Sequence, residues 1–285
     1  TDHIRSTYDE TKYARIVEFT NHDPLCFSLH WAGSFLDWII GYPQRSLERL
    51  EQAVSLARRL NHPFNFAFAL TAGAQGHLLC GDADPMLSYC DEVERVVADE
   101  GLGPFAQNVL VEQFRGMALI LKEDFAAGYD MMKQGNDFAN EIAGASDKFI
   151  CSALFWSWMT RGLGGMGRIA EALTLIDRAI VYCRDTGDCF MEPECLRLKG
   201  ELLLLNDDHD PAAAEAVLQE AVRLAQSHKA KSWELRAATS LARLWQSSAK
   251  ETAALDVLAP VYEWFTEGHE TVDLRRALTL IEELS

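Results

Sequence analysis

Small and apolar residues recur along the chain in a pattern that predicts paired helices. A small residue is followed four positions later by a larger apolar residue and three positions further by another small one, a spacing that aligns three side chains on one helix face. Ala172, Ile176 and Ala179 show the pattern, and residues 214–221 repeat it 42 positions later. The six units step by 40 to 44 residues and start at Ser46, Met86, Gly128, Ala172, Ala214 and Ala254, and those at Met86 and Gly128 fit the pattern more loosely.

A second, earlier helix is expected in each unit. Twelve residues before the first position, five units carry a small or short residue, as expected where two helices cross closely: Ser34, Ala74, Gly116, Thr160 and Ala242. The fifth unit is irregular and offers Gly200, two positions early.

Turns rich in glycine, proline and short polar residues separate the helical runs. They fall at residues 41–43, 61–63, 81–82, 101–104, 123–124, 143–144, 164–167, 187–188, 206–210, 227–228 and 247–248, and at Gly268. We therefore predict an all-α fold. It is a superhelix of about six helical hairpins that resembles tetratricopeptide repeats (TPR), with a repeat length near 42 instead of about 34.

A single domain is predicted over residues 1–285. Residues 1–22 are expected to be the remaining helix of a truncated hairpin. Residues 270–285 are expected to form a C-terminal helix that caps the array, because a terminal repeat must cover its exposed core face. The first residue is not Met, so we expect a longer parent chain. Residues 149–159 are aromatic enough to suggest a strand, but the repeat predicts a helix there.

The composition fits a folded, acidic protein. Hydrophobic residues make up 48% of the chain, which is enough for a large core. The net charge of -17 argues against binding to nucleic acid. Seven cysteines, an odd number without a Cys-x-x-Cys pair, indicate reduced thiols and a cytoplasmic protein. The sequence contains no apolar run of about 18 residues, the length that a membrane span needs.

The C-terminal part of the chain carries a family resemblance. Residues 231–244 (KSWELRAATSLARL), residues 258–268 (LAPVYEWFTEG) and Asp273-Leu274 resemble the carboxyl end of a family of bacterial multidomain signalling proteins, and residues 197–204 are similar as well. In that family a class III adenylate or guanylate cyclase domain, or a winged-helix DNA-binding domain, precedes a P-loop ATPase module and a long helical repeat region. The resemblance implies a regulatory region. This sequence has no P-loop motif, so we expect no nucleotide hydrolysis by it.

Three other motifs are explained better by structure than by chemistry. Residues 162–167 match the Gly-x-Gly-x-x-Gly dinucleotide fingerprint, but they fall on a predicted turn between helices and not after a strand. Cys26 and His30 are spaced like two zinc ligands, yet no second pair is visible. The acidic turn at residues 206–210 lacks the glycine and distal glutamate of a calcium loop. We expect no metal, no cofactor and no catalytic residue.

The repeat also predicts which positions face the concave surface of the superhelix. In TPR geometry these lie six and three residues before the small position of each first helix, and one and four after it. The candidate binding residues are Trp31, Phe35, Gln75, Gln113, Arg161, Arg236 and Arg243, with Arg197 and Lys199 as the nearest equivalents in the irregular fifth hairpin. A basic row in an acidic protein suits an acidic peptide or a phosphate. The alternative is that these arginines pair with Glu194, Glu201 and Glu234 and only hold the helices together.

These observations favour a binding protein over an enzyme. We expect a non-catalytic module that binds a protein, peptide or small ligand and modulates neighbouring cyclase or ATPase domains of its parent chain. One alternative is a scaffold that pairs two parent chains as a homodimer. Another is the regulatory region of an ATPase-type transcription regulator. An independent enzyme is the remaining alternative, for which the sequence shows no catalytic motif.

Overall fold

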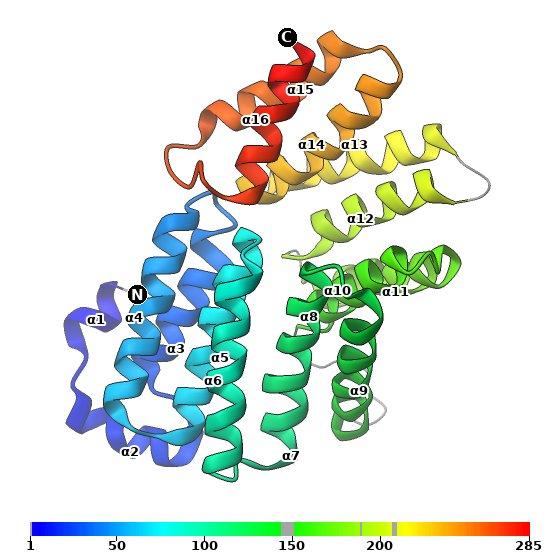
Figure 1. Cartoon of the computed structure of the whole chain (residues 1–285). Helices are drawn as coiled ribbons and strands as arrows, with labels where there is room; N and C mark the ends of the chain where they lie inside the picture. Colours follow the sequence, from blue (N-terminus) through cyan, green and yellow to red (C-terminus); the bar gives the residue numbers. More distant parts are fainter. Residues whose placement is uncertain (1, 144–150, 189, 207–209) are drawn as a thin grey trace.

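Helices alone build the part of the chain that the computed structural model describes, namely residues 2–143, 151–188, 190–206 and 210–285. They pack as consecutive pairs, and the pairs stack side by side into a superhelix (Figure 1). The predicted all-α repeat fold is therefore confirmed. Among the described helices, none combines the length and the apolar character that crossing a membrane requires.

Six hairpins form the array within the described residues. Their first helices are α3 (Pro24–Trp31) with its π-helical continuation η1 (Ala32–Asp37), α5 (Pro63–Cys80), α7 (Gly103–Phe105) with η2 (Ala106–Glu112) and α8 (Gln113–Leu121), α10 (Ser152–Gly165), α12 (Glu192–Leu205) and α14 (Lys231–Ser247). Their second helices are α4 (Pro43–Leu60), α6 (Ala83–Asp99), α9 (Phe125–Ala143), α11 (Ile169–Thr186), α13 (Pro211–Ser227) and α15 (Glu251–Trp264).

The predicted turns fall at the junctions of these helices. Residues 144 and 207–209 are exceptions only because they lie outside the described residues. The aromatic segment that ends at Met159 is helical from Ser152 onward, as the repeat predicts; its first residues, 149 and 150, are not described.

The small positions of the repeat are the points where paired helices pack most closely. Thr160 in a first helix is 1% exposed, and Ala172 in the second helix of the same hairpin is 0% exposed. At Gly116, an added Cβ would lie 2.8 Å from the carbonyl oxygen of Gly128. A side chain on either glycine would therefore push α8 and α9 apart.

The N-terminal segment differs from its prediction. The expectation of a single helix over residues 1–22 is wrong, because the structure has α1 (Asp2–Thr7) and α2 (Glu10–Thr20). Asp9 separates them, since its carboxylate accepts a hydrogen bond from the backbone N–H of Lys12 and starts a new helix. Between the two helices, the Tyr8 hydroxyl donates to Asp23 at 2.8 Å. This bond ties the break to the start of α3.

The last helix, α16 (Val272–Leu284), lies where a capping helix over residues 270–285 is predicted. It packs on α14 and α15 and buries Leu274, Ala277 and Leu280. It also reaches back to the start of the array. Val272 packs against Gly81 at the end of α5, where an added Cβ would lie 2.8 Å from the valine side chain. The helix therefore contacts both the sixth hairpin and the second.

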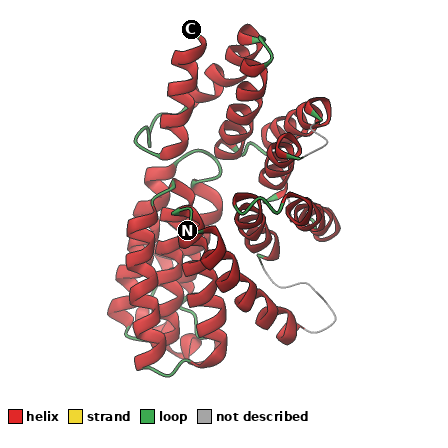
Figure 2. Ribbon diagram, turned by 45° about the vertical axis from the view of Figure 1, so that its right-hand side comes forward, coloured by secondary structure: helices red, strands yellow, loops and turns green. Residues whose placement is uncertain are grey.

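The superhelix makes one turn and closes on itself. We call this contact the closure interface; residues 37–45 and 79–81 form one side, and residues 231–236 and 264–273 form the other. In Figures 1 and 2, the C-terminal helices stand above the ends of the upright N-terminal helices. Trp38 and Trp233, each 2% exposed, meet edge to face in this interface with ring centroids 4.6 Å apart.

Helix ends supply the hydrogen bonds of the closure interface. The first turn of a helix has N–H groups without partners inside that helix. The Ser232 N–H at the start of α14 donates to the carbonyl of Ile39 at 3.0 Å. The Arg45 N–H at the start of α4 donates to the Glu267 carboxylate at 3.0 Å. Closure thus satisfies groups that neither helix can satisfy by itself.

Two glycines let the sides of the closure interface meet. Gly41 has a φ of +97°, and a Cβ there would collide with the Trp264 ring. Gly268 has a φ of +74°, and a Cβ there would collide with Pro43. Positive φ values of this kind favour glycine. Gly167, in the turn between α10 and α11, shares the conformation, with a φ of +75°, but faces open space.

Replacing Gly41 should test the closure interface against a matched glycine. We expect Gly41→Ala to lower the free energy of unfolding by about 3 kcal/mol, since it adds a collision with Trp264 to backbone strain. Gly167→Ala adds only the strain and should cost about 1 kcal/mol. Urea unfolding measures both losses, and small-angle scattering should show a larger radius of gyration for Gly41→Ala alone. Equal losses and equal radii would contradict the assignment.

Candidate functional site

The closed turn surrounds a cavity of about 570 Å³, which we call the central cavity. Its lining comes mainly from the first helices of hairpins two to six and from α16, with Phe125 added from the start of α9. Five arginines contribute to it, namely Arg161, Arg197, Arg236, Arg243 and Arg276. Three carboxylates, Glu123, Glu201 and Asp273, lie among them. A protein with a net charge of -17 therefore gathers cations at its centre.

The repeat explains how two of these arginines reach the cavity. Arg161 directly follows Thr160, and Arg243 directly follows Ala242, which are the small positions of α10 and α14. A residue one step beyond the crossing point is turned about 100° from the helix contact and faces the inside of the superhelix. Arg236 enters from the same side of α14, almost two turns earlier.

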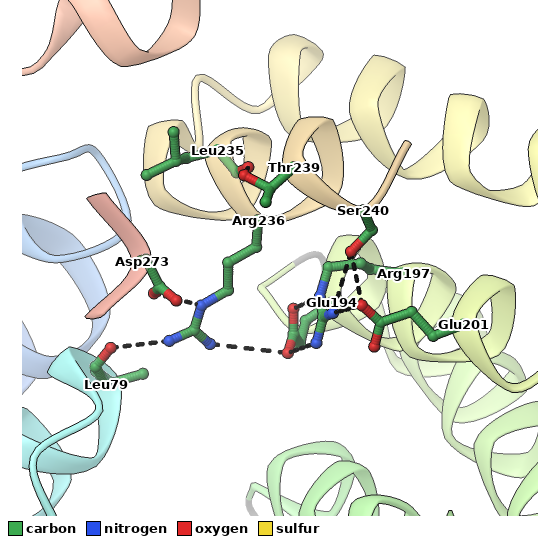
Figure 3. Close-up of polar contacts among 9 residues, drawn as sticks. All are labelled: Leu79, Glu194, Arg197, Glu201, Leu235, Arg236, Thr239, Ser240 and Asp273. Atoms are coloured by element: carbon green, nitrogen blue, oxygen red, sulfur yellow. Dashed lines mark hydrogen bonds and ion pairs between the residues drawn. The ribbon is translucent and has the colours of Figure 1, made fainter. Parts of the chain in front are cut away.

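Arg197 belongs to a buried ion-pair network (Figure 3). Its guanidinium donates two hydrogen bonds to Glu194, both at 2.7 Å, and a third to Glu201 at 2.6 Å. Ser240 on α14 donates to the same Glu201 carboxylate at 2.7 Å. Glu194 and Arg197 are only 4% and 7% exposed. The network therefore joins the fifth hairpin to the sixth across the floor of the cavity.

Arg236 connects this network to the closure interface. Its guanidinium donates to Asp273 on α16 at 2.6 Å and to the carbonyl of Leu79 at the end of α5 at 2.8 Å (Figure 3). A third nitrogen lies 3.7 Å from Glu194. The same guanidinium lies over the Trp38 ring, 4.8 Å from its centroid. One side chain thus takes part in both the cavity wall and the closure of the turn.

The charged environment shifts the pKa of Glu194. Burial by itself would raise it, but the guanidiniums of Arg197, Arg236 and Arg161 outweigh burial, and the pKa lies below its ordinary value of 4.5. Glu194 is therefore the anion that compensates several cations at once. For Arg197, the same pairing outweighs burial and raises the pKa above its ordinary value.

Arg161, Arg243 and Arg276 differ from the other two arginines. None of the three forms a hydrogen bond or an ion pair with any residue that the structure describes. The Arg161 guanidinium lies over the Trp158 ring, 4.5 Å from its centroid. Burial and the neighbouring Arg197 cation lower the pKa of Arg161 to about 10, despite the opposing effect of Glu194. Among the described residues these three cations have no carboxylate partner; Arg161 is half-buried, whereas Arg243 and Arg276 are exposed to solvent.

The remaining predicted binding residues lie elsewhere. Trp31 and Phe35 line a second cavity of about 380 Å³, together with Tyr182 and Phe190. The two predicted aromatics stack with centroids 4.4 Å apart, and Phe35 meets Phe190 at 4.7 Å. These rings bring the first hairpin against the start of the fifth, and they separate Trp31 and Phe35 from the arginines.

Gln75 and Gln113 are buried in the packing between helices and line neither cavity. The Gln75 amide neighbours His30, whose pKa burial lowers to about 4. Gln113 packs toward α9, because its Cγ would lie 3.0 Å from a Cβ on Gly135. The prediction used its spacing to Gly116 on the same helix, and that spacing does not show that α9 covers the side chain.

Lys199 also points away from the central cavity. Its ammonium pairs with Asp177 on α11 at 2.7 Å, between the fourth and fifth hairpins. Side chains two positions apart on a helix point in directions that differ by about 200°. Lys199 and Arg197 therefore cannot both face the inside, and the structure selects Arg197.

The alternative interpretation of the arginines as structural ion pairs holds for two of them. Arg197 pairs with Glu194 and Glu201, and Arg236 pairs chiefly with Asp273. Glu234, the third predicted partner, pairs with a lysine instead.

Sequence reasoning missed Arg276 altogether. It lies on α16, outside the six repeat units, and only closure of the turn brings that helix to the central cavity. The pattern of residues in the last segment does not indicate that Arg276 lines a cavity.

The structure places the glycine-rich motif and Cys26, which the sequence analysis interpreted as structural, within the helical packing. Residues 162–165 form the last turn of α10 and residues 166–167 begin the turn to α11, and no strand precedes them in the described residues. Cys26 is buried and its thiol contacts the carbonyl of Ala53 at 3.6 Å. Across the described residues, no group of three or more potential metal ligands is close enough to hold an ion.

Comparisons with known proteins leave the family open. No protein-family model matches the chain, and no match is found among curated proteins. The resemblance to bacterial signalling proteins stays a prediction, and the functional argument rests on the geometry described above.

Removing the Glu194 charge should destabilise the protein. Glu194→Gln leaves Arg197 buried without a full counter-charge, and we expect a loss of about 3 kcal/mol in the free energy of unfolding at neutral pH. Because the pKa of Glu194 is lowered in the folded protein, its contribution is complete above about pH 4.5 and is lost as the pH falls further. The difference between natural protein and variant should therefore shrink in acid. Urea unfolding at neutral and acidic pH measures this.

Glu171→Gln is the matched control for Glu194→Gln. Glu171 forms the same kind of two-bond pair with Arg168, three residues apart on the chain, but at the surface. Its loss should change the stability little at either pH. A loss as large as that of Glu194→Gln would contradict the role given to burial.

Proposed function

We propose that this chain is a non-catalytic regulatory module that binds a ligand in the central cavity and transmits its presence through the closure interface. The observation that carries the proposal is the position of Arg236, which lines the cavity and also holds the carbonyl of Leu79 across the interface. A ligand that contacts this wall changes the forces on the interface directly. The neighbouring domains of a longer signalling protein would receive the change.

The cavity lining supports binding over catalysis. Its described side chains include no histidine and no cysteine, the residues that most often act as general bases and nucleophiles near neutral pH. Its size lies within the usual range of about 300–1,000 Å³ for small-molecule sites. A cavity with convergent charged groups and apolar walls is a typical binding site.

The repeat architecture supports transmission. Each hairpin contacts mainly its neighbours, so small rotations between hairpins add along the array. In a closed turn the summed rotation changes the relative position of the two sides of the closure interface. It therefore either keeps or lengthens the hydrogen bond between the Ser232 N–H and the Ile39 carbonyl. Occupancy of the cavity would thus favour either the closed or the open turn, and output domains would respond to that equilibrium.

Filling the cavity should abolish ligand binding whatever the ligand is. Thr239→Trp places an aromatic ring in the cavity and keeps every lining arginine. Ligands found by screening small molecules and peptides for increased thermal stability should lose their effect in this variant. In the natural protein they should change the hydrogen exchange of the Ser232 amide, whose protection depends on the closure interface.

Thr174→Trp is the control for this experiment. Thr174 lies exposed on α11 and, like Thr239, donates its hydroxyl proton to the carbonyl four residues earlier. Ligand effects should persist in Thr174→Trp. The proposal fails if ligands act equally on Thr239→Trp, or if the purified chain turns over a substrate and loses this activity on cavity substitution.

A second candidate function is pairing of two parent chains. The observation that favours it is the apolar surface of α2, where Ile16 and Phe19 are 39% and 85% exposed. Light scattering should then detect a dimer, and Phe19→Ser should shift it to monomer. A chain that stays monomeric at high concentration removes this candidate.

A further inference from the structure

Three arginines that line the central cavity form no ion pair with any carboxylate in the described part of the chain. Arg161, Arg243 and Arg276 come from α10, α14 and α16 and surround one space. Each guanidinium offers five N–H donors in a planar fork that matches a carboxylate or phosphate group. The chain has 43 acidic residues against 26 basic ones, so carboxylate partners are abundant overall. Arg161 is half-buried and has no carboxylate partner among the described residues, and the exposed Arg243 and Arg276 lie on the same cavity lining. The convergence of the three on one cavity points to a partner from outside.

The net charge of the side chains around the cavity is positive, which also favours an anionic ligand. The five lining arginines exceed by one the four nearby carboxylates, which are Glu123, Glu201, Asp273 and the buried Glu194. Glu194 and Glu201 are already engaged by Arg197. Burial and the Arg197 cation make the surroundings of Arg161 unfavourable for its charge, which the lowered pKa of Arg161 reflects. An added anion would relieve this repulsion.

A neutral hydrogen-bonding group is also left without a partner beside Arg161. Thr160 lines the cavity and is 1% exposed, and its hydroxyl makes no hydrogen bond to any described residue. Threonine hydroxyls in helices commonly bond to the carbonyl four residues earlier, as Thr239 does on the opposite wall.

The rest of the lining sets the kind of molecule. Leu78, Ile120, Phe125 and Trp158 form an apolar wall next to the arginines. A bare inorganic ion would leave this wall uncovered, whereas an organic molecule covers it and presents its charge to the guanidiniums. The volume of about 570 Å³ fits a small molecule. A long acidic peptide would need an extended groove.

We propose that the central cavity binds a small organic phosphate or carboxylate through the guanidiniums of Arg161, Arg243 and Arg276. The proposal rests on the proposed function, since it names the class of ligand for the same site. Gly81 lies on one side of the closure interface, and Val272 and Asp273 lie on the other, and all three line the cavity. A ligand that touches both sides binds the closed turn and holds it closed.

Phenyl phosphate, benzoate, benzamide and a short polyglutamate peptide form the test panel. Phenyl phosphate or benzoate should raise the melting temperature, by about 5 °C at about a hundredfold excess over its Kd. The same compound should slow hydrogen exchange of the Ser232 amide. Neutral benzamide, which matches benzoate in size, should do neither.

Arginine variants give the specific readout. Without ligand, Arg161→Met should be at least as thermally stable as the natural chain, because it removes an unpaired cation. It should lose the anion-induced shift, as should Arg243→Met and Arg276→Met, and Arg161→Lys should retain part of it. Arg223→Met is the control: Arg223 is exposed on α13, away from the cavity lining, so the shift should remain.

Each contrary outcome has a distinct meaning. A shift with benzamide but not with the anions overturns the anionic ligand class and leaves the proposed function standing. A shift with polyglutamate alone overturns the small-molecule class in favour of an acidic peptide. The inference also fails if neither small anion acts, or if an anion shift persists in all three arginine-to-methionine variants.

Discussion

Closure of the superhelical turn depends on helix ends that find their hydrogen-bond partners at the far end of the chain. The Ser232 N–H, 3.0 Å from the carbonyl of Ile39, belongs to a first helical turn and has no partner in its own helix. The Leu79 carbonyl, near the end of α5, accepts from Arg236 in the same way. Such groups are costly when buried without partners. The array is stabilised when its ends meet, and the meeting completes the wall of the central cavity.

Glu194 is the second constraint, because its buried negative charge reduces the repulsion between the clustered arginines. Arg197 and Arg236 both lie within ion-pair distance of its carboxylate, and Arg161 is close enough to act on its pKa. A cation network with a single buried anion at its centre is sensitive to any further anion that enters. The charge balance of the cavity and the integrity of the closure interface are therefore linked through Arg236. This link gives the proposed regulation a physical route.

The sequence predicts part of the candidate site for a clear reason. Arg161 and Arg243 follow small residues at helix crossings, so the repeat fixes the direction of their side chains without reference to the rest of the molecule. The same rule misplaces Gln113, because it takes no account of α9, against which this side chain packs. It cannot choose between Arg197 and Lys199, because the fifth hairpin lacks the marker residue. Arg276 lies beyond the repeat and escapes the rule entirely.

The sequence by itself determined the helices, their turns and their pairing, because these depend on contacts between residues within about one repeat of each other. It also determined which residues pack at the crossings, since only small side chains fit there. The tertiary structure alone decided that the array closes, that α16 joins the cavity wall, and which arginines remain without a partner. Those outcomes depend on the sum of small rotations over six hairpins and on contacts such as Ser232 with Trp38, separated by 194 residues. No local pattern carries that information.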